Sequence, residues 1–148
     1  MPTEWVTHSA EETEALAARL LGGAPVPRAP CRVVELSGEL GAGKSTFARG
    51  ALRALGARGH IKSPSYTLLE IYELPAIRVV HLDLYRLNDP GELENLGLAD
   101  YHEPGFLWLV EWPERAAGRL PPADLRFEFF IGNGGHRIQR IETFTATK

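Results

Sequence analysis

Apolar runs of strand length recur along the chain, each bounded by glycine, proline or polar residues. They are CRVVELS at 31–37, LLEIYEL at 68–74, AIRVVHLDLYRL at 76–87 and FLWLVEW at 106–112. Short runs of this kind are typical of strands that are buried on both faces, as in a parallel sheet. The pattern therefore predicts a buried sheet built from these segments.

Two helices are predicted in the first third of the chain. Ser9 opens the motif S-A-E-E, which places Glu12 where a capping box requires it and predicts a helix to about Leu21. The proline-rich stretch at 24–30 then predicts a loop. A second helix is predicted over 44–56, because its apolar residues have helical spacing and it ends on a glycine.

The second half of the chain alternates short helices with strands and ends in a hairpin. Asp89 followed by proline predicts a helix start in 89–97, and 113–120 has the composition of a short helix. The strand candidates 124–131 and 136–144 flank Asn-Gly-Gly, a turn that joins adjacent strands. We therefore expect an α/β domain with a mainly parallel sheet and an antiparallel C-terminal hairpin. A further short strand is predicted at 5–7.

Composition narrows the class of protein. The chain has 148 residues, 44% hydrophobic and 24% charged, which suits one globular domain spanning 1–148. Its one cysteine, Cys31, opens an apolar run and is interpreted as a buried core thiol. The polar, acidic start is unlike a signal peptide, and the apolar runs are too short to cross a bilayer. We therefore expect a cytoplasmic protein without a membrane partner.

The charge balance argues against a protein that grips nucleic acid by itself. The formal net charge is −3, whereas such proteins usually carry a basic excess. Arg49 and Arg53 are four residues apart and share a face of the predicted helix. We interpret them as solvated; a docking face for RNA or protein is the alternative.

The stretch GELGAGKS at 38–45 carries the strongest chemical signal. It fits G-x-x-x-x-G-K-[ST], and it lies between an apolar strand and a helix, as this phosphate-binding loop requires. Glycines let backbone N–H groups point at phosphates, Lys44 adds charge for the β- and γ-phosphates, and Ser45 offers a hydroxyl to Mg²⁺. No lysine is followed two residues later by aspartate, as guanine recognition would require, so we expect ATP as the nucleotide, or no strong choice of base.

Carboxylates at the ends of two apolar strands complete the expected site. Asp83 follows Val-Val-His-Leu, where a Mg²⁺ anchor usually lies, although it could simply cap the strand. His81 alternates onto the same strand face, so the two could form a metal pair, but no third ligand has suitable spacing for zinc. Leu84 stands where a glutamate often follows such an aspartate. Glu111 could supply that carboxylate and either hold Mg²⁺ or orient the attacking water, or it could form a salt bridge, for example with Arg86.

Further polar residues could act on the transferred phosphate. The loop KSPSYT offers hydroxyls at Ser63, Ser65 and Thr67 that could cover the γ-phosphate, or it could be an ordinary solvated loop. Arg86 could stabilise charge in the transition state, or it could form a structural ion pair.

Taken together, these motifs resemble the bacterial TsaE family, formerly YjeE. The segments that carry the resemblance are GELGAGKST, SPSYTLLEIYE, HLDLYRLNDPGELENLGL and LVEWPER, in that order and with suitable gaps over about 9–119. The resemblance implies a three-layer P-loop NTPase-like fold. It also implies a small ATPase, needed for N6-threonylcarbamoyladenosine beside the anticodon of tRNA, that binds ATP and Mg²⁺ and supports turnover of TsaB and TsaD. Contact with tRNA would be indirect, through that complex.

The resemblance also assigns roles by motif. Lys44 matches a phosphate-binding catalytic residue, Ser45 and Glu111 match Mg²⁺ ligands, and Asp83 matches the acidic residue of the second motif. Trp112 matches the tryptophan of the EWP segment, and 63–65 matches a switch-like loop. The nucleotide loop corresponds to Glu39, Leu40, Gly41, Ala42, Gly43, Lys44, Ser45 and Thr46. Adenine contacts are expected near Ser9 and Arg137.

Two other functions remain open from the residues. A small-molecule or nucleoside kinase would need an arginine-rich lid, which is hard to place between Asp83 and Glu111. A switch module that binds nucleotide without useful hydrolysis would fit the absence of glutamate after Asp83. We expect slow hydrolysis by the isolated chain that rises with its partners.

Overall fold

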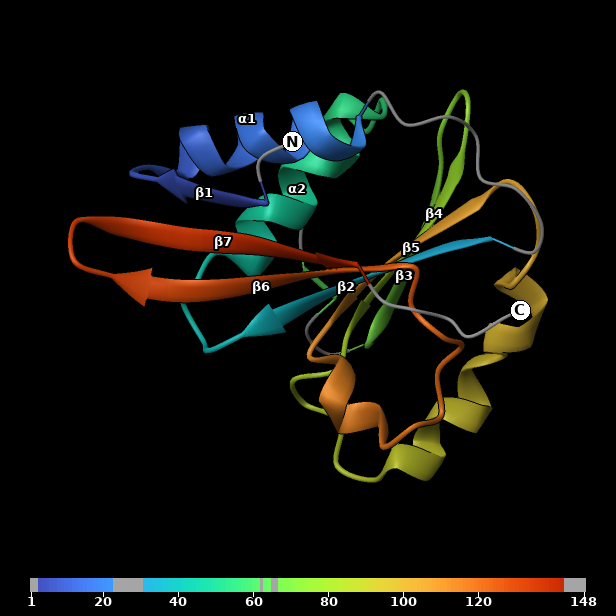
Figure 1. Cartoon of the computed structure of the whole chain (residues 1–148). Coiled ribbons are helices and arrows are strands. Elements are labelled where there is room, and N and C mark those ends of the chain that lie inside the picture. The colour runs from blue at the N-terminus through green and yellow to red at the C-terminus, as the bar shows by residue number, and fades with distance from the viewer. Residues whose placement is uncertain (1–2, 23–30, 62, 65–66, 143–148) are drawn as a thin grey trace.

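A computed structural model describes residues 3–22, 31–61, 63–64 and 67–142. Within them, one twisted seven-stranded sheet has the order β1-β7-β6-β2-β5-β4-β3, and helices lie on both of its sides (Figure 1). The strands are β1 (Glu4–Thr7), β2 (Arg32–Gly38), β3 (Leu69–Glu73), β4 (Arg78–Asp83), β5 (Phe106–Glu111), β6 (Leu125–Gly132) and β7 (Gly135–Glu142).

The centre of the sheet is parallel and its edges are antiparallel. Strands β6, β2, β5 and β4 pair in parallel, whereas β7 pairs antiparallel with β6 in the predicted C-terminal hairpin. The expected α/β fold is therefore confirmed. Two further antiparallel pairs, β1 with β7 and β3 with β4, lie at the outer edges and were not predicted.

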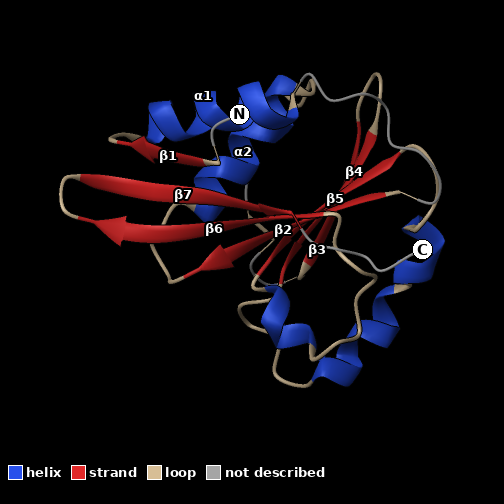
Figure 2. Ribbon diagram, viewed as in Figure 1, coloured by secondary structure: helices blue, strands red, loops and turns tan. Residues whose placement is uncertain are grey.

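Helices of two kinds form the layers on either side of the sheet. The α-helices α1 (Ala10–Leu21) and α2 (Lys44–Ala54) lie together on one side, and short 3₁₀ helices lie on the other (Figure 2). The 3₁₀ helices are η1 (Pro90–Leu96), η2 (Leu98–Tyr101) and η3 (Pro113–Ala116). Asp89 caps η1 and accepts a hydrogen bond from Gly91 N, in agreement with the helix start expected there.

The first helix begins where its capping motif predicts. Ser9 Oγ accepts a hydrogen bond from Glu12 N at 3.1 Å, and the Glu12 carboxylate accepts one from His8 N at 2.8 Å. The reciprocal contact therefore reaches back to His8, the residue before the cap. This arrangement satisfies backbone donors that a helix start leaves open.

Strand alternation divides the apolar residues between two cores. Leu107 and Leu109 of β5 pack with α1 and α2, whereas Trp108 and Val110 pack on the side of the 3₁₀ helices. Successive side chains of a strand point to opposite faces, so Glu111 is directed to the α-helical side. The same rule applies to β4, where Val79 contacts the α-helical core and Val80 the other.

Helices α1 and α2 approach each other closely at Gly50. A Cβ placed on Gly50 would lie 2.5 Å from Glu14 Cα, so only glycine fits this contact. Arg49 Nε lies 2.9 Å and Arg53 Nη1 3.6 Å from the Glu14 carboxylate. Arg53 is exposed, in agreement with its interpretation as solvated, whereas Arg49 is partly buried, and α1 places the Glu14 carboxylate beside both arginines.

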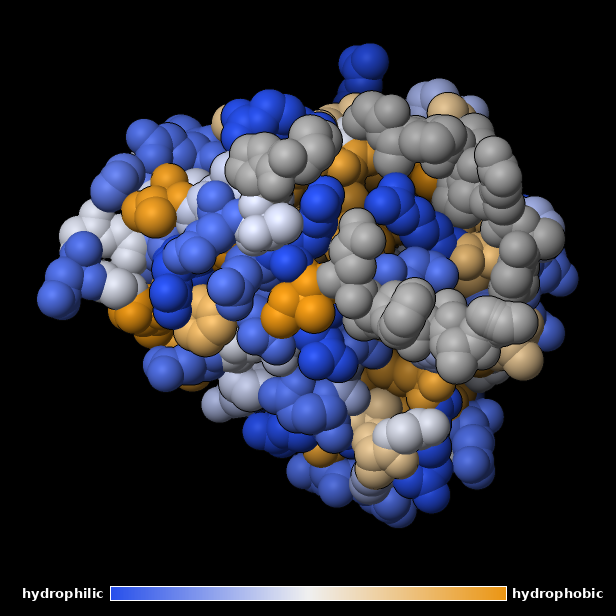
Figure 3. All heavy atoms as spheres, in the orientation of Figure 1, coloured by the Kyte–Doolittle hydropathy of each residue, from blue (hydrophilic) through white to orange (hydrophobic). Residues whose placement is uncertain are grey.

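The expectations for Cys31 and for membrane-spanning segments can be compared with the structure. Cys31 is buried, as expected, and no helix within the described ranges is both long and apolar enough to cross a membrane. On the coloured part of the face in Figure 3, hydrophobic side chains form small separate groups among hydrophilic ones. The exposed large hydrophobic residues include Leu40 and Ile131, which are respectively 64% and 52% exposed.

Candidate functional site

The glycine-rich segment connects the end of β2 to the start of α2. Gly41 and Gly43 have positive φ angles of 82° and 109°, which glycine adopts without strain. Gly43 is the N-cap residue of α2, and no side chain caps this helix. The first N–H groups of α2 are therefore left for a ligand, and the helix dipole favours an anion there.

A pocket of about 860 Å³ opens in front of this helix start. Its walls come from the loop, from the ends of β4 and β5, from the start of α1 and from the β6–β7 hairpin. Six of the eight residues predicted to hold the nucleotide line it, namely Leu40, Gly41, Gly43, Lys44, Ser45 and Thr46. Glu39 contributes its carbonyl oxygen to Lys44 instead, and Ala42 is buried in the core.

Lys44 lies at the base of the pocket and is only 4% exposed. Its Nζ donates to the carbonyl oxygens of Gly38 at 2.5 Å and Glu39 at 2.9 Å, and lies 4.3 Å from the centre of the Trp112 ring. Burial lowers the pKa of Lys44, while the nearby carboxylates, Glu111 foremost, oppose that shift. The side chain is thus a buried cation held beside the helix start.

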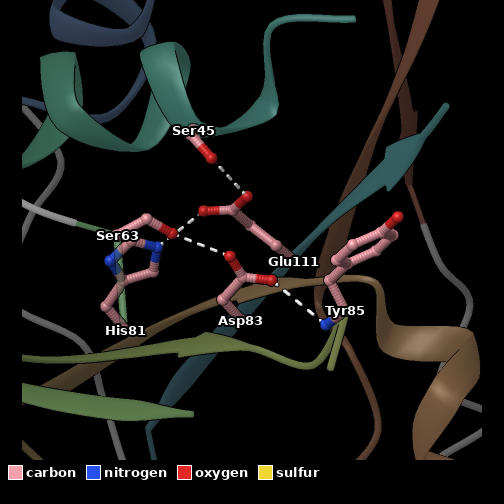
Figure 4. Close-up of polar contacts among 6 residues, drawn as sticks. All are labelled: Ser45, Ser63, His81, Asp83, Tyr85 and Glu111. Atoms are coloured by element: carbon pink, nitrogen blue, oxygen red, sulfur yellow. Dashed lines mark hydrogen bonds and ion pairs between the residues drawn. The ribbon is translucent and has the colours of Figure 1, made fainter. Parts of the chain in front are cut away.

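Glu111 joins the loop to the neighbouring strand. Its Oε1 accepts a hydrogen bond from Ser45 Oγ at 2.8 Å, and its Oε2 lies 2.7 Å from His81 Nε2 (Figure 4). The side chains of Glu111 and His81 are each 2% exposed. His81 is therefore a buried hydrogen-bond partner of Glu111, whereas the partner considered from the sequence was Arg86.

Asp83 lies beside Glu111 because the two strands are in parallel register, with Asp83 opposite Glu111. Its Oδ2 accepts a hydrogen bond from Ser63 Oγ at 2.7 Å, and its Oδ1 accepts one from Tyr85 N at 3.1 Å. Asp83 and His81 project from the same face of β4 toward α2, as the alternation predicted (Figure 4). The structure thus brings both expected carboxylates to one edge of the sheet.

The donor set fits a small, hard cation. Two neighbouring ligands of an octahedral Mg²⁺ ion, each about 2.1 Å from the metal, lie about 3.0 Å apart. Ser45 Oγ and Glu111 Oε1 are 2.8 Å apart, so one ion could replace the hydrogen bond between them. Within the described ranges no group of three His, Cys, Asp or Glu side chains could hold a metal. Mg²⁺ bound to a nucleotide needs few protein ligands, because water and phosphate complete its shell.

Trp112 forms the floor between the loop and the exposed rim. It has a φ of 59°, in the left-handed region that non-glycine residues rarely adopt. Its ring packs on Tyr85 with centroids 5.0 Å apart, and the Arg115 guanidinium lies 5.5 Å from its centroid. The ring centre lies 4.3 Å from Lys44 Nζ, and Trp112 lines the pocket.

The structure describes three of the remaining predicted residues, and the fourth lies outside the described residues. Arg86 is exposed and lines the pocket, and Ser63 reaches Asp83. Thr67 bonds to the Leu69 carbonyl within a turn and does not line the pocket. Ser65 lies outside the described residues, so its expected position over the phosphate stays a prediction.

One wall of the pocket comes from residues that sequence reasoning did not name. Thr7 and Thr13 share a buried hydrogen bond of 2.7 Å, and His8 Nδ1 lies 2.5 Å from Gly134 O. Because β1 pairs with β7, Thr7 stands opposite His136, and all five residues line the pocket. The edge pairing of β1 would have to be known to find this wall.

The structure places the residues near which adenine contacts are expected, and the contacts themselves stay a prediction. Ser9 lines the pocket, in agreement with its expected position. Arg137 does not line it: its guanidinium lies 4.5 Å from the Phe130 ring centre and pairs with Glu4 at 3.5 Å. The neighbouring His136 faces the pocket instead.

Comparison with known proteins decides the family. The family model described as "Threonylcarbamoyl adenosine biosynthesis protein TsaE" matches residues 7–138. The chain belongs to the TsaE family. Among TsaE relatives, the tRNA threonylcarbamoyladenosine biosynthesis protein TsaE of Haemophilus influenzae is 48% identical over 109 residues, covering 74% of this chain and 69% of that protein. The TsaE protein of Bacillus subtilis is 36% identical over 143 residues, covering 97% of this chain and 85% of its own length.

A solved structure agrees with this assignment. The crystal structure of Bacillus subtilis YdiB aligns with a TM-score of 0.75 and 29% identity, over 95% of this chain and 85% of YdiB. The TsaE family, the loop geometry and this likeness together support a P-loop NTPase-like protein. The resemblance drawn from the motifs is thereby confirmed.

Proposed function

We propose that this chain is the ATPase subunit that N6-threonylcarbamoyladenosine modification of tRNA requires beside the anticodon. It binds and hydrolyses ATP with Mg²⁺ to support turnover of a TsaB–TsaD complex. One observation carries the proposal: Lys44 and Ser45, at the start of α2, meet Asp83 and Glu111 in a single pocket. Membership of the TsaE family supports the pathway.

The phosphates of ATP are assigned to the open start of α2. The loop N–H groups and the helix dipole stabilise negative charge there, and Lys44 supplies a full positive charge within the pocket. Its acceptors among the described residues are the carbonyls of Gly38 and Glu39, so its Nζ can exchange them for a phosphate oxygen. Because Lys44 is buried, the interaction is little screened by water.

Ser45 and Glu111 are the residues that would hold Mg²⁺. The 2.8 Å between Ser45 Oγ and Glu111 Oε1 places both oxygens where one ion can reach them. When bound, the ion neutralises charge that develops on the β- and γ-phosphate oxygens. Glu111 itself remains oriented by the sheet and by His81.

Asp83 is assigned to the attacking water. In hydrolysis, the water oxygen bonds to the γ-phosphorus, the bond from that phosphorus to the bridging oxygen breaks, and ADP and phosphate leave. The water loses a proton, and Asp83 can accept it or orient the water, since Ser63 and Tyr85 N hold its carboxylate in place. Arg86, at the pocket wall, can stabilise charge on the transferred group.

The proposed partners are supported by the family's pathway and by the charge of the chain. A net charge of −3 leaves no basic excess with which to bind tRNA alone, so TsaB and TsaD would carry most of that contact. The expected cytoplasmic location and the choice of ATP over other nucleotides stay predictions.

The kinase alternative is weakened by the fold. The segment between Asp83 and Glu111 forms η1 and η2, whose apolar residues Leu93, Leu96 and Leu98 pack in the core opposite α1 and α2. These two helices therefore lie on the other side of the sheet from α2, where a lid over the phosphates is not expected, whereas Tyr85 and Arg86 at the start of the segment line the pocket. One observation still supports the alternative of a switch module that binds nucleotide without useful hydrolysis. Leu84, which follows Asp83, is fully buried and adds no carboxylate.

Reconstitution of the modification tests the proposed function. Purified TsaB and TsaD are incubated with ATP, unmodified tRNA and TsaC, the enzyme that makes the threonylcarbamoyl adenylate that TsaD consumes. The incubation is run with and without this chain, and N6-threonylcarbamoyladenosine is measured by mass spectrometry after nuclease digestion. We expect repeated turnover only when the chain is present. Equal turnover without it would contradict the function.

A further inference from the structure

His81 is a buried polar side chain to which the proposed mechanism gives no chemical step. It lies in β4 with 2% of its surface exposed, and its Nε2 is 2.7 Å from Glu111 Oε2. Its other ring nitrogen, Nδ1, is buried and has no hydrogen-bond partner within the described part of the chain. The Glu111 contact is thus the one polar contact that the described residues give to this ring.

The contact has a defined direction. An ionised carboxylate, which is the form that binds a cation, can only accept hydrogen bonds. His81 Nε2 is therefore the donor to Glu111. This donation occupies Glu111 Oε2 and leaves Oε1 facing Ser45 (Figure 4). The ring comes from the strand beside Glu111, where parallel pairing sets His81 opposite Leu109. Neither partner can swing into water, because both side chains are enclosed.

We propose that His81 is a positioning residue that makes Glu111 a one-oxygen ligand and so favours Mg²⁺ over Ca²⁺. The inference rests on the proposed function, since it concerns the cation that accompanies ATP. Magnesium requires a compact octahedral shell, whereas Ca²⁺ accepts more ligands and often takes both oxygens of a carboxylate. With Oε2 held by His81, Glu111 offers the single oxygen that suits the smaller ion.

Two amide side chains of different length, glutamine and asparagine, test this role. Glutamine can place its amide nitrogen near the position of His81 Nε2, so His81→Gln keeps a donor toward Glu111. Asparagine places its nitrogen near Nδ1, which has no described partner, so His81→Asn loses the donation. His81→Leu is a second variant without a donor and retains an apolar side chain in the buried position.

The measurement is ATP affinity by calorimetry in EDTA, in MgCl₂ and in CaCl₂, for the wild type and the three variants. Mg²⁺ should increase the ATP affinity of the wild type. In His81→Asn and His81→Leu this increase should be smaller by about 10-fold or more, because loss of an outer-shell partner of a metal ligand typically weakens metal binding by such a factor. The increase in ATP affinity that Ca²⁺ causes should fall less than the increase that Mg²⁺ causes. The preference of these variants for Mg²⁺ over Ca²⁺ should therefore be smaller than that of the wild type. Affinity in EDTA should stay the same, and His81→Gln should remain within about 3-fold of the wild type.

The outcomes separate this inference from the proposed function. If wild-type affinity were equal in all three buffers, the magnesium part of the proposed function would fail. If the wild type responded to Mg²⁺ and a folded His81→Asn or His81→Leu responded equally, the positioning role would be overturned. Thermal unfolding is recorded for every variant. Unfolding of both donor-free variants would also overturn it, because the contact would then serve the fold.

Discussion

Single residues of the pocket combine burial with charge. Lys44, His81, Asp83 and Glu111 are all less than a tenth exposed, although taking such groups from water is costly. Each is stabilised by a short contact to a backbone carbonyl, a hydroxyl or another side chain of the group. Polar groups held in this way are pre-organised for a charged ligand.

The first residue-scale prediction concerns Lys44. In Lys44→Ala, ATP affinity measured by calorimetry should fall by about 10-fold or more, because a charge-assisted contact in a shielded site is lost. Arg58→Ala is the matched control, since Arg58 is exposed and does not line the pocket, and it should bind ATP as the wild type does. Unchanged affinity in Lys44→Ala would remove the loop from the phosphate site.

The second concerns Glu111. In Glu111→Ala, ATP hydrolysis in the presence of the partners should fall on the order of 100-fold, because the cation loses its one carboxylate ligand. Glu103→Ala removes an exposed carboxylate away from the pocket and should leave the rate unchanged. Normal hydrolysis by Glu111→Ala at limiting Mg²⁺ would mean that Glu111 does not bind the ion.

Which residues line the pocket can be predicted where the determinants are local. Lys44 and Ser45 follow from one short motif, and Glu111 from its place at the end of an apolar strand. The bond from His81 to Glu111 depends on the register of β4 with β5, which spacing along the chain does not specify. For the same reason, His136 in the pocket wall could not be anticipated.

At the scale of elements, the strongest periodic segments were predicted most accurately. Helix α1 ends at Leu21, as expected, because its cap and its apolar spacing agree. The segments expected as ordinary short helices at 89–97 and 113–120 are 3₁₀ turns instead, the latter limited to Pro113–Ala116. Short helices gain little from propensity, so tertiary packing selects their geometry.

An element-scale prediction concerns the contact of α1 with α2. Gly50→Ala should lower the free energy of unfolding in urea by about 1–3 kcal/mol, because the added methyl overlaps the Glu14 backbone and forces the helices apart. Gly91→Ala is the control, since its added Cβ would lie 3.5 Å from Asp89 Oδ1, an ordinary contact distance. Equal stability of the two variants would contradict the close helix contact.

For the whole molecule, the layered arrangement explains where the pocket lies. Strands β2, β4 and β5 are parallel, so their carboxyl ends meet at one edge, and α2 starts at that edge. Ligands commonly bind at such edges of α/β sheets. The parallel centre was predictable from the alternation of strands with helices. The order of the edge strands was not, because it depends on pairing between distant segments such as β1 with β7.

A prediction at this scale concerns pH and global stability. Burial, and secondarily Asp124, raises the pKa of Cys31 from 9.0 to about 11. Between these values the unfolded thiol loses its proton while the folded one keeps it, so stability present below pH 9 is lost as the pH rises toward 11. The free energy of unfolding should fall more in the wild type than in Cys31→Ala, by on the order of 2 kcal/mol. Parallel pH profiles would contradict this burial effect.

The most direct test of the central claim is the rate of ATP hydrolysis by the pure chain, alone and then with TsaB, TsaD and tRNA. Lys44→Ala serves as the control for contaminating ATPases. We predict slow hydrolysis by the chain alone and a clear rise when the partners are added, absent in Lys44→Ala. An unchanged rate, together with no complex on a sizing column, would contradict the account.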